Sequence, residues 1–86
     1  MIRIRCKYFL LPRVTPKMEE VDIEVPRLGH LIERLKERYG RDLLKELLSP
    51  FTLILINGKP VHSVDEFHAE LKNGDEITFL HVVDGG

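Results

Sequence analysis

The hydrophobic period of the chain changes along its length, and this change limits the folds that it can adopt. Residues Ile2–Phe9 and Val21–Val25 alternate between apolar and polar side chains, which is typical of strands with one buried face. From residue 28 the apolar positions follow helical spacing instead, and they are Leu28, Leu31, Ile32, Leu35 and Tyr39. Pro26 before this stripe and Gly40 after it fit the start and the C-terminal cap of a helix. The first half therefore predicts two strands followed by one amphipathic helix.

The charged residues of the two predicted strands have opposite signs. The outward positions of the first are basic and those of the second are acidic, and they are Arg3, Arg5, Lys7, Asp22 and Glu24. Opposite charges that face each other across neighbouring strands would stabilise an antiparallel hairpin. Pairing within the sheet thus explains the basic row, and the net charge of −1 lacks the basic excess of a nucleic-acid-binding protein.

The second half of the chain predicts three more strands that are separated by turns. Phe51–Ile56 is continuously apolar, as expected for a strand buried on both faces, and Asn57-Gly58 directly after it is a strong hairpin signal. The return strand is the short segment Lys59–Val61. A final strand, Glu76–Val82, follows a second turn at Asn73-Gly74.

Two shorter helical segments complete the pattern. Asp42–Leu48 is expected to form a short helix that stops before Pro50, and Val64–Leu71 has room for a helical turn. The order strand, strand, helix, strand, strand, turn, strand predicts the α+β class, in which a mixed sheet has one main helix packed across it. With 86 residues the chain is expected to be a single domain, 1–86.

Composition argues against several classes of protein. Cys6 is the one cysteine, so it has no partner for an intramolecular disulfide, and we expect it to be a buried and inert thiol. No two of the four histidines have the i, i+4 spacing of a metalloprotease motif, so we expect no bound metal. The N-terminus lacks the apolar core of a signal peptide, and no apolar run is long enough to span a membrane. We expect a cytoplasmic protein that does not bind membranes.

The order of elements and several short motifs resemble the β-grasp fold of ubiquitin-like proteins, and more narrowly the MoaD/ThiS family of sulfur carriers. The resemblance covers essentially the whole chain. It rests on the opening strand that leads into a proline-bearing loop, on ILINGKPV at Ile54–Val61, on NGDEITFL at Asn73–Leu80, and on the terminal Gly85-Gly86. The length and the Asp42–Leu48 segment are more similar to MoaD than to the shorter ThiS proteins.

This resemblance implies a carrier function for the C-terminus. A MoeB/ThiF-like adenylyltransferase would use ATP to adenylate Gly86, which would then become a thiocarboxylate and donate sulfur in molybdopterin biosynthesis. The chain would be the non-catalytic small subunit of a molybdopterin synthase, with its tail inserted into a MoaE-like large subunit and no cofactor bound to itself. Glycine suits this role, because Gly85 and Gly86 can thread a narrow channel and adopt any φ that it imposes. Residues 82–86 are accordingly expected to be a flexible functional tail.

Hydrophobic residues beside the tail are candidate partner contacts. Leu80 lies outside the core-facing alternation of the last strand, and an exposed hydrophobe next to a functional terminus is typical of a docking surface. The full set of candidate contacts is Leu80, Val82 and Val83. His81 and Asp84 also lie near the tail, and the sequence leaves open whether they contact a partner or are only surface residues.

Two alternatives follow from the same residues. MoaD tails usually carry prolines where this chain has His81 and Val82, so a ThiS-like carrier for thiamine thiazole synthesis, or a ubiquitin-like modifier of protein lysines, fits the same terminus. The other class is a β-grasp interaction domain whose terminus has no chemistry. Deletion of Gly86 separates the classes, because it abolishes a carrier function and leaves simple binding intact.

Overall fold

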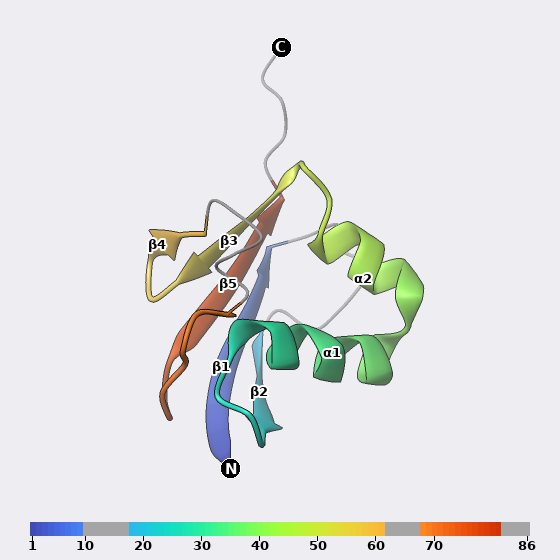
Figure 1. Ribbon diagram of the computed structural model, residues 1–86. Coiled ribbons are helices and arrows are strands. Elements are labelled where there is room, and N and C mark those ends of the chain that lie inside the picture. The colour runs from blue at the N-terminus through green and yellow to red at the C-terminus, as the bar shows by residue number, and fades with distance from the viewer. Residues whose placement is uncertain (10–17, 62–67, 82–86) are drawn as a thin grey trace.

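The computed structural model describes residues 1–9, 18–61 and 68–81, which form five strands and two helices (Figure 1). In chain order these elements are β1 (Ile2–Phe9), β2 (Met18–Ile23), α1 (Leu28–Tyr39), α2 (Arg41–Leu47), β3 (Thr52–Ile56), β4 (Lys59–Pro60) and β5 (Glu76–His81). Neither helix is long and apolar enough to cross a membrane within the described ranges.

The strands form one mixed sheet in the order β2-β1-β5-β3-β4. The first and last strands lie side by side at its centre and run parallel, whereas the other pairings are antiparallel. A parallel pair needs a long crossover connection, and here both helices and the β3–β4 hairpin lie between β1 and β5 in the chain. The predicted α+β class, a mixed sheet with one main helix packed across it, is confirmed.

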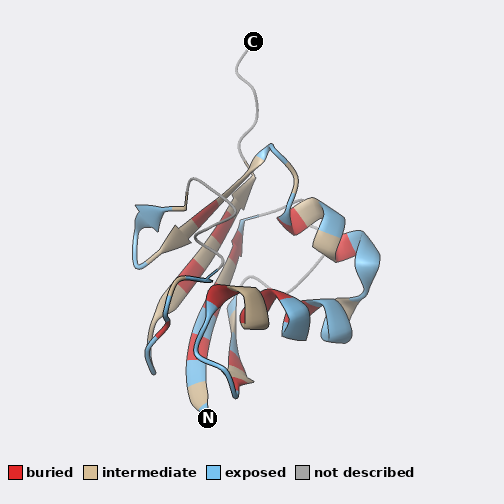
Figure 2. Cartoon of the chain, in the orientation of Figure 1, coloured by how far each residue is buried: buried red, intermediate tan, exposed pale blue. Residues whose placement is uncertain are grey.

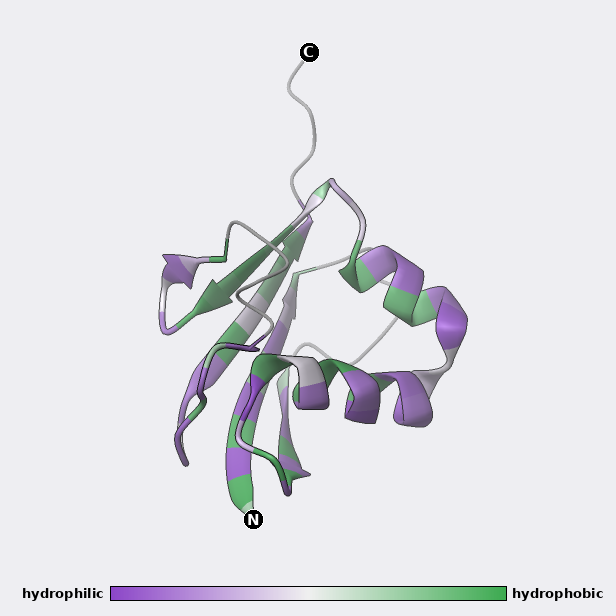
Figure 3. Ribbon diagram, in the orientation of Figure 1, coloured by the Kyte–Doolittle hydropathy of each residue, from purple (hydrophilic) through white to green (hydrophobic). Residues whose placement is uncertain are grey.

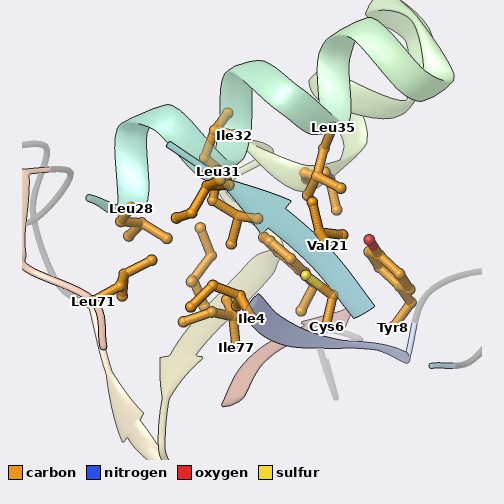
Figure 4. Packing of buried hydrophobic residues seen from close by; sticks show 14 of the residues in the cluster. Ile4, Cys6, Tyr8, Val21, Leu28, Leu31, Ile32, Leu35, Leu71 and Ile77 are labelled. Atoms are coloured by element: carbon orange, nitrogen blue, oxygen red, sulfur yellow. The ribbon is translucent and has the colours of Figure 1, made fainter. Parts of the chain in front are cut away.

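Helix α1 spans the predicted apolar stripe and covers one face of the sheet (Figure 1). It begins at Leu28 after the N-cap residue Arg27, so Pro26 lies before the helix and not in its first turn. Its buried stripe faces the inward side chains of the central strands (Figure 4). The residues buried at this interface include Leu28, Leu31, Ile32 and Leu35 from the helix, Ile4, Cys6 and Tyr8 from β1, and Ile77 and Phe79 from β5. Gly40 caps the helix after its last residue, Tyr39, because its φ of +89° favours glycine and its N–H donates to the Lys36 carbonyl at 2.7 Å.

Burial is lower than the sequence predicts at two hydrophobic positions. Val25 is 44% exposed because β2 ends at Ile23, where the chain turns toward α1. Phe51 is 55% exposed because β3 begins one residue later, and Ile54 is the buried residue of that strand. The expectation of a strand buried on both faces is therefore wrong, since helices cover one face and the other stays partly open (Figure 2).

The predicted turns fix where β5 begins. Asn57 and Gly58 have φ values of +50° and +85°, as the hairpin between β3 and β4 requires. The Asn57 side chain also reaches the second turn, because its amide donates to Asp75 at 3.0 Å and its carbonyl accepts the Glu76 N–H at 2.9 Å.

The expected helical turn over Val64–Leu71 falls partly outside the described residues. Within the described part, Leu71 is buried and Glu70 forms an isolated bridge with Arg27.

Candidate functional site

Strand β5 carries the chain to the predicted carrier terminus. Its last residue, His81, pairs with Thr52, and the preceding Leu80 pairs with Leu53 on β3 and with Phe9 on β1. The predicted tail residues Val82, Val83, Gly85 and Gly86 lie outside the described residues, so their roles stay predictions. The candidate site therefore consists of the surface from which the tail departs.

An apolar row crosses the open face of the sheet directly before the tail. The register places Phe9, Leu80 and Leu53 opposite one another, and their direct neighbours Tyr8, Phe79 and Ile54 all point into the core. Because neighbouring residues of a strand point to opposite faces, this row lies on the face away from the helices. Phe9 is 52% exposed, and Leu53 and Leu80 are partly buried.

Leu55 lies on the same face, two residues further along β3, opposite Thr78 and Pro60. We call Phe9, Leu53, Leu55 and Leu80 the terminal patch. Its composition agrees with the hydrophobic colouring that runs along β3 in Figure 3. Leu80 is thus partly exposed beside the tail, and its role as a docking contact stays a prediction. Phe9 was not identified from the sequence. It continues the outward-facing row of Arg3, Arg5 and Lys7, and this position indicated an exposed aromatic side chain.

The turn between α2 and β3 holds the end of β5. The Thr52 hydroxyl donates to the Glu46 carbonyl at 2.6 Å, and the Thr52 N–H donates to the Ser49 carbonyl at 3.0 Å. Since Thr52 is the ladder partner of His81, these bonds fix the strand against which the last described residue lies. The segment that forms α2 therefore helps to set the place where the tail begins.

The other half of the open face is charged. Arg3 pairs with Asp22 on β2 at 3.0 Å, and Lys7 pairs with Glu76 on β5 at 3.2 Å. The predicted antiparallel hairpin with opposite charges facing each other is confirmed. Arg5 lies between the acidic residues Glu20 and Glu76 in the register. The open face is thus divided into a self-neutralised half and an apolar half, and the apolar half adjoins the tail.

A polar cluster around Glu19 joins β1, β2 and α1. Glu19 of β2 accepts hydrogen bonds from the hydroxyls of Tyr8 and Tyr39 at 2.7 Å each, and Arg38 donates to its second oxygen at 2.7 Å. The Tyr8 ring stacks on Phe79 with 5.6 Å between centroids. Burial raises the pKa of Tyr8 above its usual range and raises that of Tyr39 to about 12, with the bond to Glu19 acting in the same direction. The cluster ties β1, β2 and α1 together behind the terminal patch.

Glu19 was not identified from the sequence. Its signal was the inward register that it shares with Val21 and Ile23, since an acidic residue in that register needs partners.

Cys6 is fully buried, and burial raises the pKa of its thiol to about 12. These findings agree with the expectation of an inert thiol. Within the described ranges, no three histidine, cysteine, aspartate or glutamate side chains are grouped closely enough to hold a metal ion.

Sequence comparison identifies relatives over most of the chain. The ThiS family matches residues 7–86. A protein of Archaeoglobus fulgidus named "Putative sulfur carrier protein" is 36% identical over an alignment of 72 residues, and the match covers 78% of this chain and 82% of that protein. The sequence-based resemblance to the MoaD/ThiS family is therefore confirmed.

Solved structures of ubiquitin-like β-grasp proteins have the same fold as this chain. One from Pyrococcus furiosus, named "Putative molybdopterin converting factor, subunit 1", is 26% identical with a TM-score of 0.76, over 96% of this chain and 100% of that chain. A chain in the Helicobacter pylori complex of subunits 1 and 2 of molybdopterin-converting factor is 25% identical with a TM-score of 0.68, over 99% and 100% of the two chains. The protein belongs to the ThiS family and is a ubiquitin-like sulfur carrier of the ThiS/MoaD type.

Proposed function

We propose that this protein is the small subunit of a molybdopterin synthase, in which Gly86 carries sulfur as a thiocarboxylate. The observation that carries the proposal is the row Phe9–Leu80–Leu53, an apolar surface next to the point where the chain leaves the sheet toward Gly85-Gly86. A carrier whose terminus reacts inside another protein needs such a surface, because docking must hold the body while the tail enters the active site.

The chemistry begins at a group that does not react unaided. A C-terminal carboxylate has a reference pKa of about 3.5, so it is ionised and a poor electrophile at neutral pH. A carboxylate oxygen of Gly86 attacks the α-phosphorus of ATP, which forms an acyl-adenylate and releases pyrophosphate. Hydrosulfide, or an equivalent sulfur nucleophile, then attacks the carbonyl carbon, and AMP leaves with the bridging oxygen. The partner binds the ATP and performs both steps, so this chain supplies the substrate terminus rather than the catalytic groups.

Two partners follow from this scheme. The first is a MoeB/ThiF-like adenylyltransferase, which forms the adenylate. The second is a MoaE-like large subunit, in which the thiocarboxylate transfers sulfur to the molybdopterin precursor. The similar Helicobacter pylori chain is in a complex of subunits 1 and 2, which supports a two-subunit assembly. The names of the Pyrococcus furiosus and Helicobacter pylori proteins support a molybdopterin precursor as the acceptor.

The direct test is mass spectrometry of the C-terminal fragment. The full chain is incubated with ATP, a sulfur donor and the adenylyltransferase of the same organism. The expected product has sulfur in place of one oxygen on Gly86. The C-terminal fragment must be analysed, because oxidation of Met1 or Met18 adds nearly the same mass to the intact protein. A terminus that stays a plain carboxylate, with no adenylate and no conjugate, contradicts the proposal.

The acceptor is tested in a second step. Thiocarboxylated protein is mixed either with the MoaE-like subunit and the molybdopterin precursor, or with a thiazole synthase and its substrates. We expect sulfur loss from Gly86 in the first mixture only. A variant that lacks Gly86 is the matched control, since it keeps the terminal patch and should bind the large subunit without accepting sulfur.

A further inference from the structure

One edge of the sheet is open to pairing with a further strand. Within the described residues the two edges are β2, which lies beside β1, and β4 (Figure 1). The β4 strand has 2 residues, and one of them is Pro60, which has no N–H to donate. The β2 strand has 6 residues and contains neither proline nor glycine. A longer, unblocked edge of this kind is a template for the addition of an extended segment.

The register determines which backbone groups of β2 point outward. The Arg5 N–H donates to the Asp75 carbonyl at 2.9 Å, so Arg5 bonds toward β5. Successive residues of a strand direct their N–H and C=O groups to opposite sides, so Ile4 bonds toward β2, where Val21 is its partner. The backbone groups that point away from β1 are therefore those of the residues on both sides of Val21, which are Glu20 and Asp22. None of these groups forms a backbone hydrogen bond with another described residue.

The side chains of these two residues make the edge acidic on the open face of the sheet. Glu20 and Asp22 lie on that face, because the residue between them points into the core. In the register Glu20 is opposite Arg5, and Arg5 is opposite Glu76 on β5, so the charges alternate in sign across the strands. The pair of Arg3 and Asp22 also ends in a carboxylate at the edge. Glu20 forms no ion pair with another described residue, so a basic side chain on a further strand would continue the alternation.

Helix α1 leaves space beside this edge. A groove of about 260 Å³ lies between α1 and the end of β2, and its lining includes Asp22, Glu24, His30, Arg34 and Glu37. A strand added to β2 would direct every second side chain toward the face that α1 covers, and the groove has room for a side chain there.

The same charges disfavour a second copy of this chain as the added strand. An antiparallel pair of β2 strands centred on Val21 places Glu20 opposite Asp22. A pair centred on either acidic residue places that residue opposite itself. Like charges that face each other across neighbouring strands are destabilising, so the edge favours a segment of opposite charge.

We propose that the edge of β2 binds an extended segment of a partner protein that has lysine or arginine at alternate positions. The segment adds a strand beside β2, and its basic side chains lie next to Glu20 and Asp22 on the open face. β2 contributes no residue to the terminal patch, so a partner at this edge leaves that patch uncovered. The inference does not rest on the proposed function, because it involves neither the tail nor the terminal patch.

A synthetic peptide serves as the probe for this edge. The acetylated and amidated peptide Lys-Val-Lys-Val-Lys-Val is titrated into the nitrogen-15-labelled full chain, and Glu-Val-Glu-Val-Glu-Val is the control peptide. Amide chemical shifts give the binding surface and the Kd, and hydrogen exchange reports whether the outward N–H groups of Glu20 and Asp22 become bonded. The free protein should exchange these two amides faster than that of Val21, which bonds to β1.

Two substitutions at Glu20 separate the backbone contribution from the charge. Glu20→Pro removes the outward N–H and no bond to β1, so it should weaken binding of the basic peptide by at least tenfold. Glu20→Lys should raise the Kd of the basic peptide about fivefold and lower that of the acidic peptide. Glu33→Lys is the matched control, since Glu33 is exposed on α1 and does not line the groove, and it should change either Kd less than twofold. A melting temperature for each variant shows whether it is folded, and Glu20→Lys decides the matter if Glu20→Pro is not.

Slower exchange of the Glu20 and Asp22 amides with the basic peptide, together with the exchange of preference in Glu20→Lys, supports the inference. Shift changes that map to another surface overturn it, as does a Kd that Glu20→Lys leaves unchanged. Amides of Glu20 and Asp22 that already exchange as slowly as that of Val21 in the free protein also overturn it, because the edge is then covered without a partner.

Discussion

Replacing Phe9 with alanine should weaken the proposed binding to the large subunit. A phenylalanine side chain offers roughly 200 Å² of surface, and 52% exposure leaves about 100 Å² for a partner to cover. At about 25 cal/mol per Å², covering this area contributes about 2.5 kcal/mol, so Phe9→Ala should raise the Kd about 60-fold. The buried half of the ring, also about 100 Å², contributes a similar amount to the stability of the free protein, so stability must be measured beside the Kd.

Titration calorimetry of the purified carrier with the MoaE-like subunit measures the Kd, and a thermal melt of each free variant measures stability. Val25→Ala is the matched control, because Val25 is 44% exposed and follows β2 at the opposite end of the sheet, where Ile23 pairs with Ile2. The control should change the Kd less than threefold. Equal effects of the two substitutions, or an unchanged Kd for Phe9→Ala, would show that the terminal patch is not the docking surface.

Two further predictions concern the interior. Glu19→Gln leaves at least one of the donors of Tyr8, Tyr39 and Arg38 without an acceptor. We expect the free energy of unfolding to fall by about 2 kcal/mol and the melting temperature to fall by roughly 8–16 °C. Glu20→Gln, at an outward-facing position, is the control in the same scan and should change neither quantity. Burial raises the folded-state pKa of the Cys6 thiol from 9.0 to about 12, so its thiolate forms more readily in the unfolded chain, and stability should fall as the pH rises from 9.0 toward about 12. Urea titrations across that range test the slope for wild type against Cys6→Ala, and a slope identical in both proteins would contradict the assignment to Cys6.

Features that depend on short stretches of chain were predicted correctly from the sequence. The helical stripe that begins at Leu28 gave the correct bounds of α1, and Asn57-Gly58 gave the hairpin with its positive φ values. The opposite charges of the first two strands gave their antiparallel pairing. Each of these results follows from side-chain period, backbone preference or the charges of neighbouring segments, and such properties are local. The terminal glycines, together with these elements, were also enough to indicate the family.

Features that require distant residues to meet were missed or misjudged. The buried state assigned to Phe51 was wrong, because helices cover one face of the sheet and the other face stays partly open. Glu19 lies 11 residues from Tyr8 and 20 from Tyr39 in the chain, so no local pattern announces the bonds between them.

The terminal patch has the same origin. Phe9 and Leu80 become neighbours through the parallel pairing of β1 and β5, and that pairing forms only when the helices and the hairpin between those strands have folded back onto the sheet. Period and charge along the chain specify which face of a strand is apolar, whereas the choice of neighbouring strand depends on how the whole chain buries its apolar faces together. A carrier function for the terminus was therefore predicted from the last two residues together with the family resemblance, whereas the terminal patch exists only in the folded sheet.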